Sequence, residues 1–103
     1  MPNRYVLEGI ASDLEGGANI AVFTPRYASV ASMLHQITEY TDETYTQVLA
    51  TSRQILHESG GIVTVLSDSL QARGMDFDVI VVPHGSASEF PFFLTPRVEI
   101  IEY

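Results

Sequence analysis

The sequence predicts a single α/β domain over residues 1–103, built on a mostly parallel sheet that includes an antiparallel hairpin and has helices packed on its faces. Three observations lead to this prediction. Residues 77–82 are apolar except at one position and rich in β-branched side chains, as in a strand buried on both faces. Residues 19–23 form another apolar strand followed at once by a helical pattern. Residues 59–61 place two glycines between β-prone runs, which favours a hairpin.

The composition is that of a globular domain with a strong acidic excess. Hydrophobic residues make up 46% and charged residues 17%, so we expect a packed core. Thirteen acidic residues face five basic ones, giving a net charge of -8, and there is no lysine. Duplex DNA and anionic membranes are bound through clustered basic residues, so we expect neither as a partner. The acidic excess favours a basic protein partner instead.

Cysteine and histidine usage argues against a metal centre. The chain has no cysteine, and His35, His57 and His84 lack ligand-like spacing, so we expect no metal and no cofactor. The first twenty residues contain no apolar run that would serve as a signal peptide or membrane span. We therefore predict a cytoplasmic protein.

Residues 3–14 are predicted to form the first helix. Asn3 is a suitable N-cap and Gly16-Gly17 a suitable stop. The apolar face is expected to contain Tyr5, Val6, Ile10, Ala11 and Leu14.

Residues 25–39 are predicted to form the second helix, directly after the strand at residues 19–23. Thr24 is a good N-cap and Pro25 suits the first helical position. The expected apolar stripe contains Tyr27, Val30, Ala31, Leu34 and Ile37. His35 lies beside this stripe, where we expect an ordinary packed or solvated side chain.

Residues 41–58 fit either of two structures. Apolar positions nearly match a helix face, while TYTQVLAT is rich in β-branched residues. The glycines at 60 and 61 lead us to favour strands, with residues 53–58 and 62–66 as the arms of a hairpin. The alternative is one helix from Asp42 to Ser59 capped by Gly60.

The second half of the chain contains a polar connector, a buried strand, an apolar cluster and a final strand. The connector spans residues 67–76, the strand 77–82, and the final alternating strand 97–103, which could pair with another copy if it lies at a sheet edge. The apolar cluster is either a lid over the core or a partner-binding surface, and it gives the candidate interface Phe90, Phe92, Phe93 and Leu94.

Several segments resemble the RecA-like ATPase core of phage terminase large subunits and, more loosely, superfamily 2 helicases. NIAVFTPRYASVASMLHQI resembles the strand and helix that follow the phosphate-binding region. RQILHESGGIVTVLSDSLQARGMDFDVIVV is similar to the family's hairpin, Arg-Gly connector and Walker B strand, and SDSLQARGMDF to a helicase motif. The resemblance covers residues 10–84 and implies a phage-encoded protein, located in the host cytoplasm, with a small RecA-like or Rossmann-like fold.

The residues that would hydrolyse ATP in that family are absent. A Walker A loop needs a lysine for the phosphates, and this chain has none. Pro83 and His84 occupy the positions of the two Walker B acids. We therefore expect a degenerate, P-loop-less ATPase fold without self-contained ATP hydrolysis.

A candidate ligand or nucleotide site remains around the predicted buried strand, formed by Arg73, Asp76, Asp78, His84 and Ser86. Arg73 could act as an arginine finger, although a loop arginine paired with an aspartate is the interpretation we favour. Asp76 and Asp78 would share one face of an extended segment, yet two carboxylates are too few for a cation site. His84 and Ser86 could suggest a hydrolase, but no nucleophile elbow is present. We assign no catalytic residue.

Three hypotheses for function follow. The first is a non-enzymatic protein that acts through protein–protein association, with a protein partner or as a homo-oligomer, a homodimer being the simplest. The second is a nucleotide-binding or hydrolytic module that completes its site with a partner subunit. The third is an acidic DNA-mimic inhibitor, which requires carboxylates arrayed along one surface.

Overall fold

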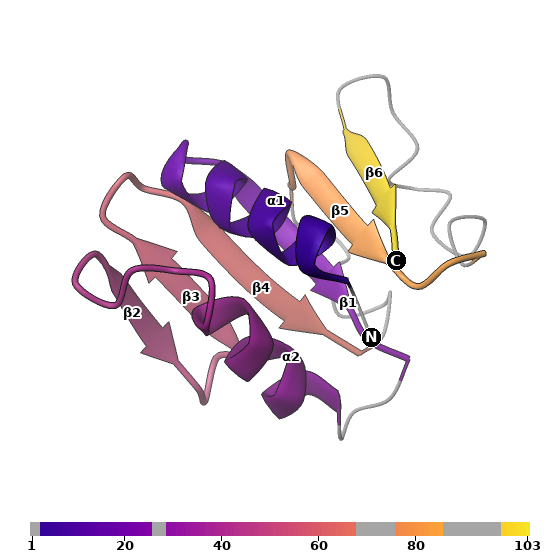
Figure 1. Ribbon diagram of the computed structural model, residues 1–103, viewed down its shortest axis with the longest axis horizontal. Helices are drawn as coiled ribbons and strands as arrows, with labels where there is room; N and C mark the ends of the chain where they lie inside the picture. The colour runs from indigo at the N-terminus through magenta and orange to yellow at the C-terminus, as the bar shows by residue number, and fades with distance from the viewer. Residues whose placement is uncertain (1–2, 26–28, 68–75, 86–97) are drawn as a thin grey trace.

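The computed structural model describes residues 3–25, 29–67, 76–85 and 98–103. They form two helices and six strands (Figure 1). The elements in chain order are α1 (Arg4–Glu15), β1 (Asn19–Phe23), α2 (Ser29–Thr38), β2 (Thr46–Leu49), β3 (Gln54–His57), β4 (Ile62–Leu66), β5 (Val79–Val82) and β6 (Glu99–Glu102).

The strands form one mixed sheet in the order β2-β3-β4-β1-β5-β6. β4, β1, β5 and β6 run parallel to one another, while β2 and β3 form an antiparallel extension beside β4. The predicted α/β class, the mostly parallel sheet and the antiparallel hairpin are therefore confirmed. β5 lies between β1 and β6, as its apolar sequence indicated, and β6 lies at a sheet edge (Figure 1).

Both described helices pack on the same face of the sheet. α1 contacts β1, α2 contacts β3 and β4, and the two helices contact each other (Figure 1). Their core includes Ile10, Leu14 and Ile37 against Val22 and Val63. On the opposite face a second buried cluster contains Ala21, Phe23, Leu66, Phe77, Ile80 and Val82. Strands β1, β4 and β5 are thus buried on both faces, which explains their nearly continuous apolar sequences.

Helix α1 is confirmed close to its predicted bounds, but its buried face includes Leu7, which was not predicted, and lacks Tyr5. The side chain of Asn3 accepts a hydrogen bond from the Val6 N–H at 3.0 Å, as an N-cap does. The buried residues are Leu7, Ile10, Ala11 and Leu14. Tyr5 is 79% exposed, so its predicted place on the apolar face is wrong. At about 100° per residue, Tyr5 lies almost opposite Leu7 on the helix.

Helix α2 is shorter than the predicted helix over residues 25–39. Pro25 lies in a bend and Glu39 in a turn, outside the helix, and Tyr27 lies outside the described residues. The Thr24 N–H donates to the Leu66 carbonyl oxygen at 2.8 Å, which continues the pairing of β1 with β4. Val30, Leu34 and Ile37 are buried as predicted. Ala31 is exposed, so its predicted place on the apolar stripe is wrong.

The two strands favoured for residues 41–58 are confirmed as β2 and β3, which excludes the single helix over this region. β3 and β4 form the predicted hairpin around Ser59-Gly60-Gly61, with Gly60 at a φ of 96°. β2 and β3 are joined by a turn in which Arg53 adopts a φ of 56°.

The β3–β4 hairpin loop caps the carboxyl end of α1. The Ser59 hydroxyl donates to the Leu14 carbonyl oxygen at 2.8 Å and accepts from the Gly61 N–H at 3.2 Å. A side chain at Gly61 would collide with the Leu14 carbonyl oxygen, a backbone atom that cannot rotate away. Only glycine allows the loop to approach the helix this closely.

We therefore expect Gly61→Ala to destabilise the protein by about 1–3 kcal/mol, the usual cost of forcing an extra methyl group into a packed contact. Gly9→Ala is the matched control, because it adds the same methyl group on α1, where no atom lies within 4 Å. This control should gain up to about 1 kcal/mol through helix propensity. Urea denaturation of both variants measures the difference, and equal stabilities would show that the loop does not depend on this close approach.

Candidate functional site

The predicted pair Asp76 and Asp78 lies at the amino end of β5, where it is tied to the amino end of β1. The Asp78 carboxylate accepts from the Asn19 N–H at 2.9 Å, and the Asn19 side-chain amide donates to the Asp76 carbonyl oxygen at 2.6 Å. The Asp78 N–H donates in turn to the Asn19 carbonyl oxygen at 2.8 Å. These bonds align β5 with β1, so Asp78 has a structural role here.

His84 lies at the opposite, carboxyl end of β5. Its side chain is 87% exposed, and Nδ1 lies 3.8 Å from the Glu102 carboxylate. The Gly85 N–H donates to the same carboxylate at 3.2 Å. β5 runs between His84 and the Asp76–Asp78 pair, so the structure does not bring these residues together around one ligand.

The remaining predicted residues cannot be placed. Arg73 and Ser86 of the candidate nucleotide site lie outside the described residues, as does the candidate interface of Phe90, Phe92, Phe93 and Leu94. In the ranges that the structure does describe, no group of three or more histidine, aspartate or glutamate side chains is arranged to hold a metal ion. None of the described helices is long and apolar enough to cross a membrane.

The carboxyl end of the sheet contains one tightly held tyrosine, Tyr103. Its hydroxyl donates to the Phe23 carbonyl oxygen at 2.6 Å, so the last residue of the chain reaches from β6 past β5 to the end of β1. Burial raises the pKa of this phenol above its ordinary value, because the charged phenolate is poorly solvated there. Tyr103 therefore fastens the edge strand to the centre of the sheet.

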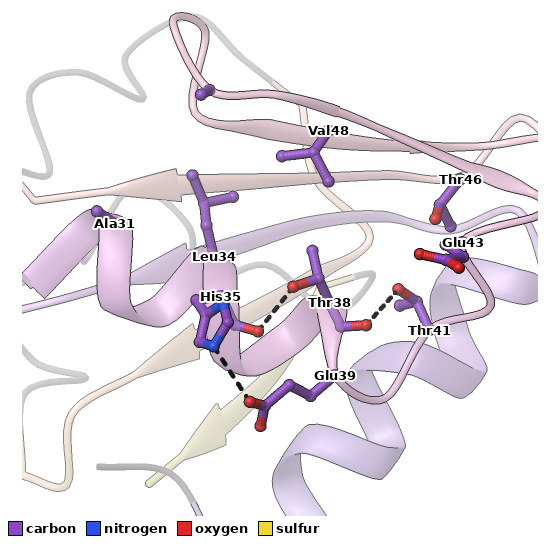
Figure 2. Close-up of a pocket in the computed structure, with 10 residues that line it drawn as sticks. Ala31, Leu34, His35, Thr38, Glu39, Thr41, Glu43, Thr46 and Val48 are labelled. Carbon is purple, nitrogen blue, oxygen red and sulfur yellow. Dashed lines mark hydrogen bonds and ion pairs between the residues drawn. The ribbon is translucent and has the colours of Figure 1, made fainter.

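The clearest concave surface lies between α2 and the edge strand β2, and we call it the α2–β2 groove (Figure 2). Its volume is about 510 Å³, within the usual range for ligand clefts. The residues that line it are Ala31, Leu34, His35, Thr38, Glu39, Thr41, Glu43, Thr46, Val48 and Ala50. The aliphatic ones come from both elements, so the groove has an apolar floor with polar groups around it.

The groove exists because α2 covers β3 and β4 but stops short of covering β2. α2 packs against β3 and β4 through its buried side, while Val48 on β2 remains 47% exposed. Figure 2 shows Val48 and Leu34 on opposite sides of the groove. The apolar surface of β2 on this face is therefore left partly uncovered.

The backbone of β2 is open along the same edge. The Tyr45 carbonyl oxygen accepts from the Glu58 N–H at 2.9 Å, which makes Tyr45 a bonded partner of the neighbouring strand. Bonded and non-bonded residues alternate in an antiparallel pair, so the observed register directs Gln47 and Leu49 toward β3. The N–H and C=O groups of Thr46 and Val48 face away from the sheet, and within the described ranges we find no hydrogen-bond partner for them.

Charges around the groove are mainly negative. Glu39 and Glu43 line it, and none of the described residues that line it is an arginine. His35 Nε2 lies 3.2 Å from the Glu39 carboxylate, with both side chains largely exposed (Figure 2). The Thr38 hydroxyl donates to the His35 carbonyl oxygen, and the Thr41 hydroxyl donates to the Thr38 carbonyl oxygen. These hydrogen bonds hold the backbone at the carboxyl end of α2, where the chain turns toward β2.

Sequence reasoning did not find this groove. The prediction placed Ala31 within the buried stripe of the helix and His35 beside it, and it favoured strands over residues 41–58 without relating them to that helix. The sequence of β2 contains one weak sign of an uncovered strand face. Of the two β2 residues that face α2, Val48 is aliphatic but Thr46 is polar, as expected where a face is only partly buried. The position of α2 over β3 and β4 is set by tertiary packing, which the sequence pattern does not contain.

Comparison with known proteins identifies no relative. No family model, no curated protein and no solved structure matches the chain.

Removing the Tyr103 hydroxyl should change both the stability and its dependence on pH. At pH 8 we expect Tyr103→Phe to lose about 1 kcal/mol, the usual value of one hydrogen bond. Because burial in the folded protein raises the pKa of Tyr103, the contribution of Tyr103 to the free energy of unfolding is fully present below the ordinary tyrosine pKa of 10.0. This contribution is lost as the pH rises through the pKa that Tyr103 has in the folded protein.

Denaturation at a series of pH values between 8 and about 11.5, spanning ordinary tyrosine ionisation, measures this effect. The stability advantage of the natural protein over Tyr103→Phe should shrink above pH 10. Tyr5→Phe is the control, because Tyr5 is exposed and should show no such narrowing. A constant difference between natural protein and Tyr103→Phe across the range would contradict the assignment.

Proposed function

We propose that this protein acts by binding another polypeptide, which adds as an extended strand to the edge of β2 and fills the α2–β2 groove. The observation that carries the proposal is the outward-facing backbone of Thr46 and Val48 beside a groove with an apolar floor. A strand added to a sheet edge gains affinity from main-chain hydrogen bonds and specificity from its alternate side chains. The protein needs no catalytic residue for this function.

The two edges of the sheet are not equally suited to such binding. The exposed side chains of β6 are Glu99 and Glu102, and charged side chains are a common means of protecting an edge strand. Glu102 is also engaged with the Gly85 N–H. β2 has no charged residue in its four positions and borders the groove, so we favour β2 as the binding edge.

The terminase-like origin remains part of the proposal. Its support is the arrangement of β1, α2, the β3–β4 hairpin and β5 in one mostly parallel sheet. The absence of lysine supports the loss of ATP hydrolysis. A nucleotide-binding module is less well supported, because Asp76 and Asp78 lie at the opposite end of β5 from His84. We therefore propose a degenerate ATPase-like fold that serves association rather than hydrolysis.

Val48→Pro provides a test of strand addition. Proline removes the outward N–H of Val48 without removing a hydrogen bond between β2 and β3, because Val48 is a non-bonded position in that pair. Peptides first selected for binding from a displayed random library should lose about tenfold or more in affinity, since they lose a main-chain bond and groove contacts. Fluorescence anisotropy with the labelled peptides measures the loss.

Two further measurements make this test decisive. Val48→Thr is the matched control, because it retains the backbone N–H and the side-chain shape and should bind more tightly than Val48→Pro. Backbone amide NMR spectra of the natural protein with the selected peptides should show changes at residues 46–50 and along α2. Changes confined to β6, or the failure of any peptide to be selected, would contradict strand addition at β2.

A further inference from the structure

We infer that the segment bound in the α2–β2 groove belongs to a different protein and has a basic residue at one end of an extended stretch with aliphatic side chains. This inference rests on the proposed function and names the chemistry of the partner.

Glu43 and the apolar floor occupy different ends of the groove. Glu43 lies three residues before Thr46, just ahead of β2, whereas Glu39 follows the end of α2 and its carboxylate lies beside His35 (Figure 2). The floor, with Leu34 and Val48, lies farther along β2 toward Ala50. A bound strand would therefore meet negative charge at the Thr46 end and aliphatic surface over the rest of its length.

An added strand presents side chains to this surface at every second position. β2 has four residues, so about two such positions lie over the groove, at a rise of roughly 3.3 Å per residue. Aliphatic side chains of moderate size match the floor at these positions. The next position on the same face, beyond Thr46, lies near Glu43, where a lysine or arginine would be attracted.

Charge argues against a second copy of this chain as the occupant. Pairing of β2 with β2 of another copy would present residues 44–49, which carry no basic side chain, to the groove. Each copy also has a net charge of -8, and like charges brought together at an interface oppose association. Among the described residues that line the groove, His35 is the one cationic candidate, and Glu39 already engages it. A basic segment from another protein is the complementary partner.

Three capped seven-residue peptides test this inference. All carry valine at the third and fifth positions and threonine at the even positions, so that the odd positions face the groove. The two end positions carry lysine, glutamine or glutamate, which allows the strand to bind in either direction. Titration of the labelled protein, followed by the amide resonances of residues 46–50, gives the three dissociation constants.

We expect the lysine peptide to bind most tightly and the glutamate peptide most weakly, with about a fivefold difference between these two at low salt, as expected for partly exposed ion pairs. Adding salt should narrow the difference, because exposed charges are screened. The double variant Glu39→Gln, Glu43→Gln should bind all three peptides about equally. Glu8→Gln, on the exposed side of α1 away from the groove, should retain the preference for lysine.

The possible failures are distinguishable. Equal affinity of the three peptides, or a lysine preference that survives the double variant, would overturn the charge assignment and leave strand addition in place. If no peptide shifts residues 46–50, the proposed function fails as well. Concentration-dependent dimers in sedimentation that Val48→Pro abolishes would identify a second copy as the occupant and overturn the inference.

Discussion

Strand β1 is buried on both faces, and the rest of the sheet depends on pairing its backbone. β4 and β5 run parallel to it on either side, so its peptide groups bond to neighbours in place of water. Both ends are fastened by polar groups: Asn19 bonds to Asp78 at the amino end, and Tyr103 donates to Phe23 at the carboxyl end. These polar side chains thus serve the sheet, which explains why residues that suggest chemistry in the sequence have structural partners here.

The same packing leaves β2 as the part of the sheet most open to a partner. α1 and α2 cover the strands around β1 and β4, and α2 reaches only as far as β3. β2 is held by its pairing with β3 on one side, while the other side keeps unpaired peptide groups in the described structure. The groove is therefore a direct consequence of a sheet that is wider than the helices covering it.

Local sequence patterns predicted the strands well and the groove not at all. The strands at residues 19–23 and 62–66 have the predicted bounds, because continuous β-branched runs and the Gly60-Gly61 turn are local signals. Tyr5 and the start of α2 at Pro25 were mispredicted, since each depends on how a helix is rotated or where it meets the sheet. Ala31 and Val48 come together only through α2 packing, so no spacing in the sequence could indicate a site between them.

The acidic composition gives the open edge its selectivity. An uncovered edge strand without charged side chains is prone to pair with copies of itself. In this protein β2 lacks such side chains, and protection comes instead from Glu39 and Glu43 beside it and from the net charge of -8. Repulsion between like-charged copies disfavours self-pairing, whereas a basic segment is attracted to the same edge. In the function that we propose, one charge distribution both limits self-association and selects a basic partner.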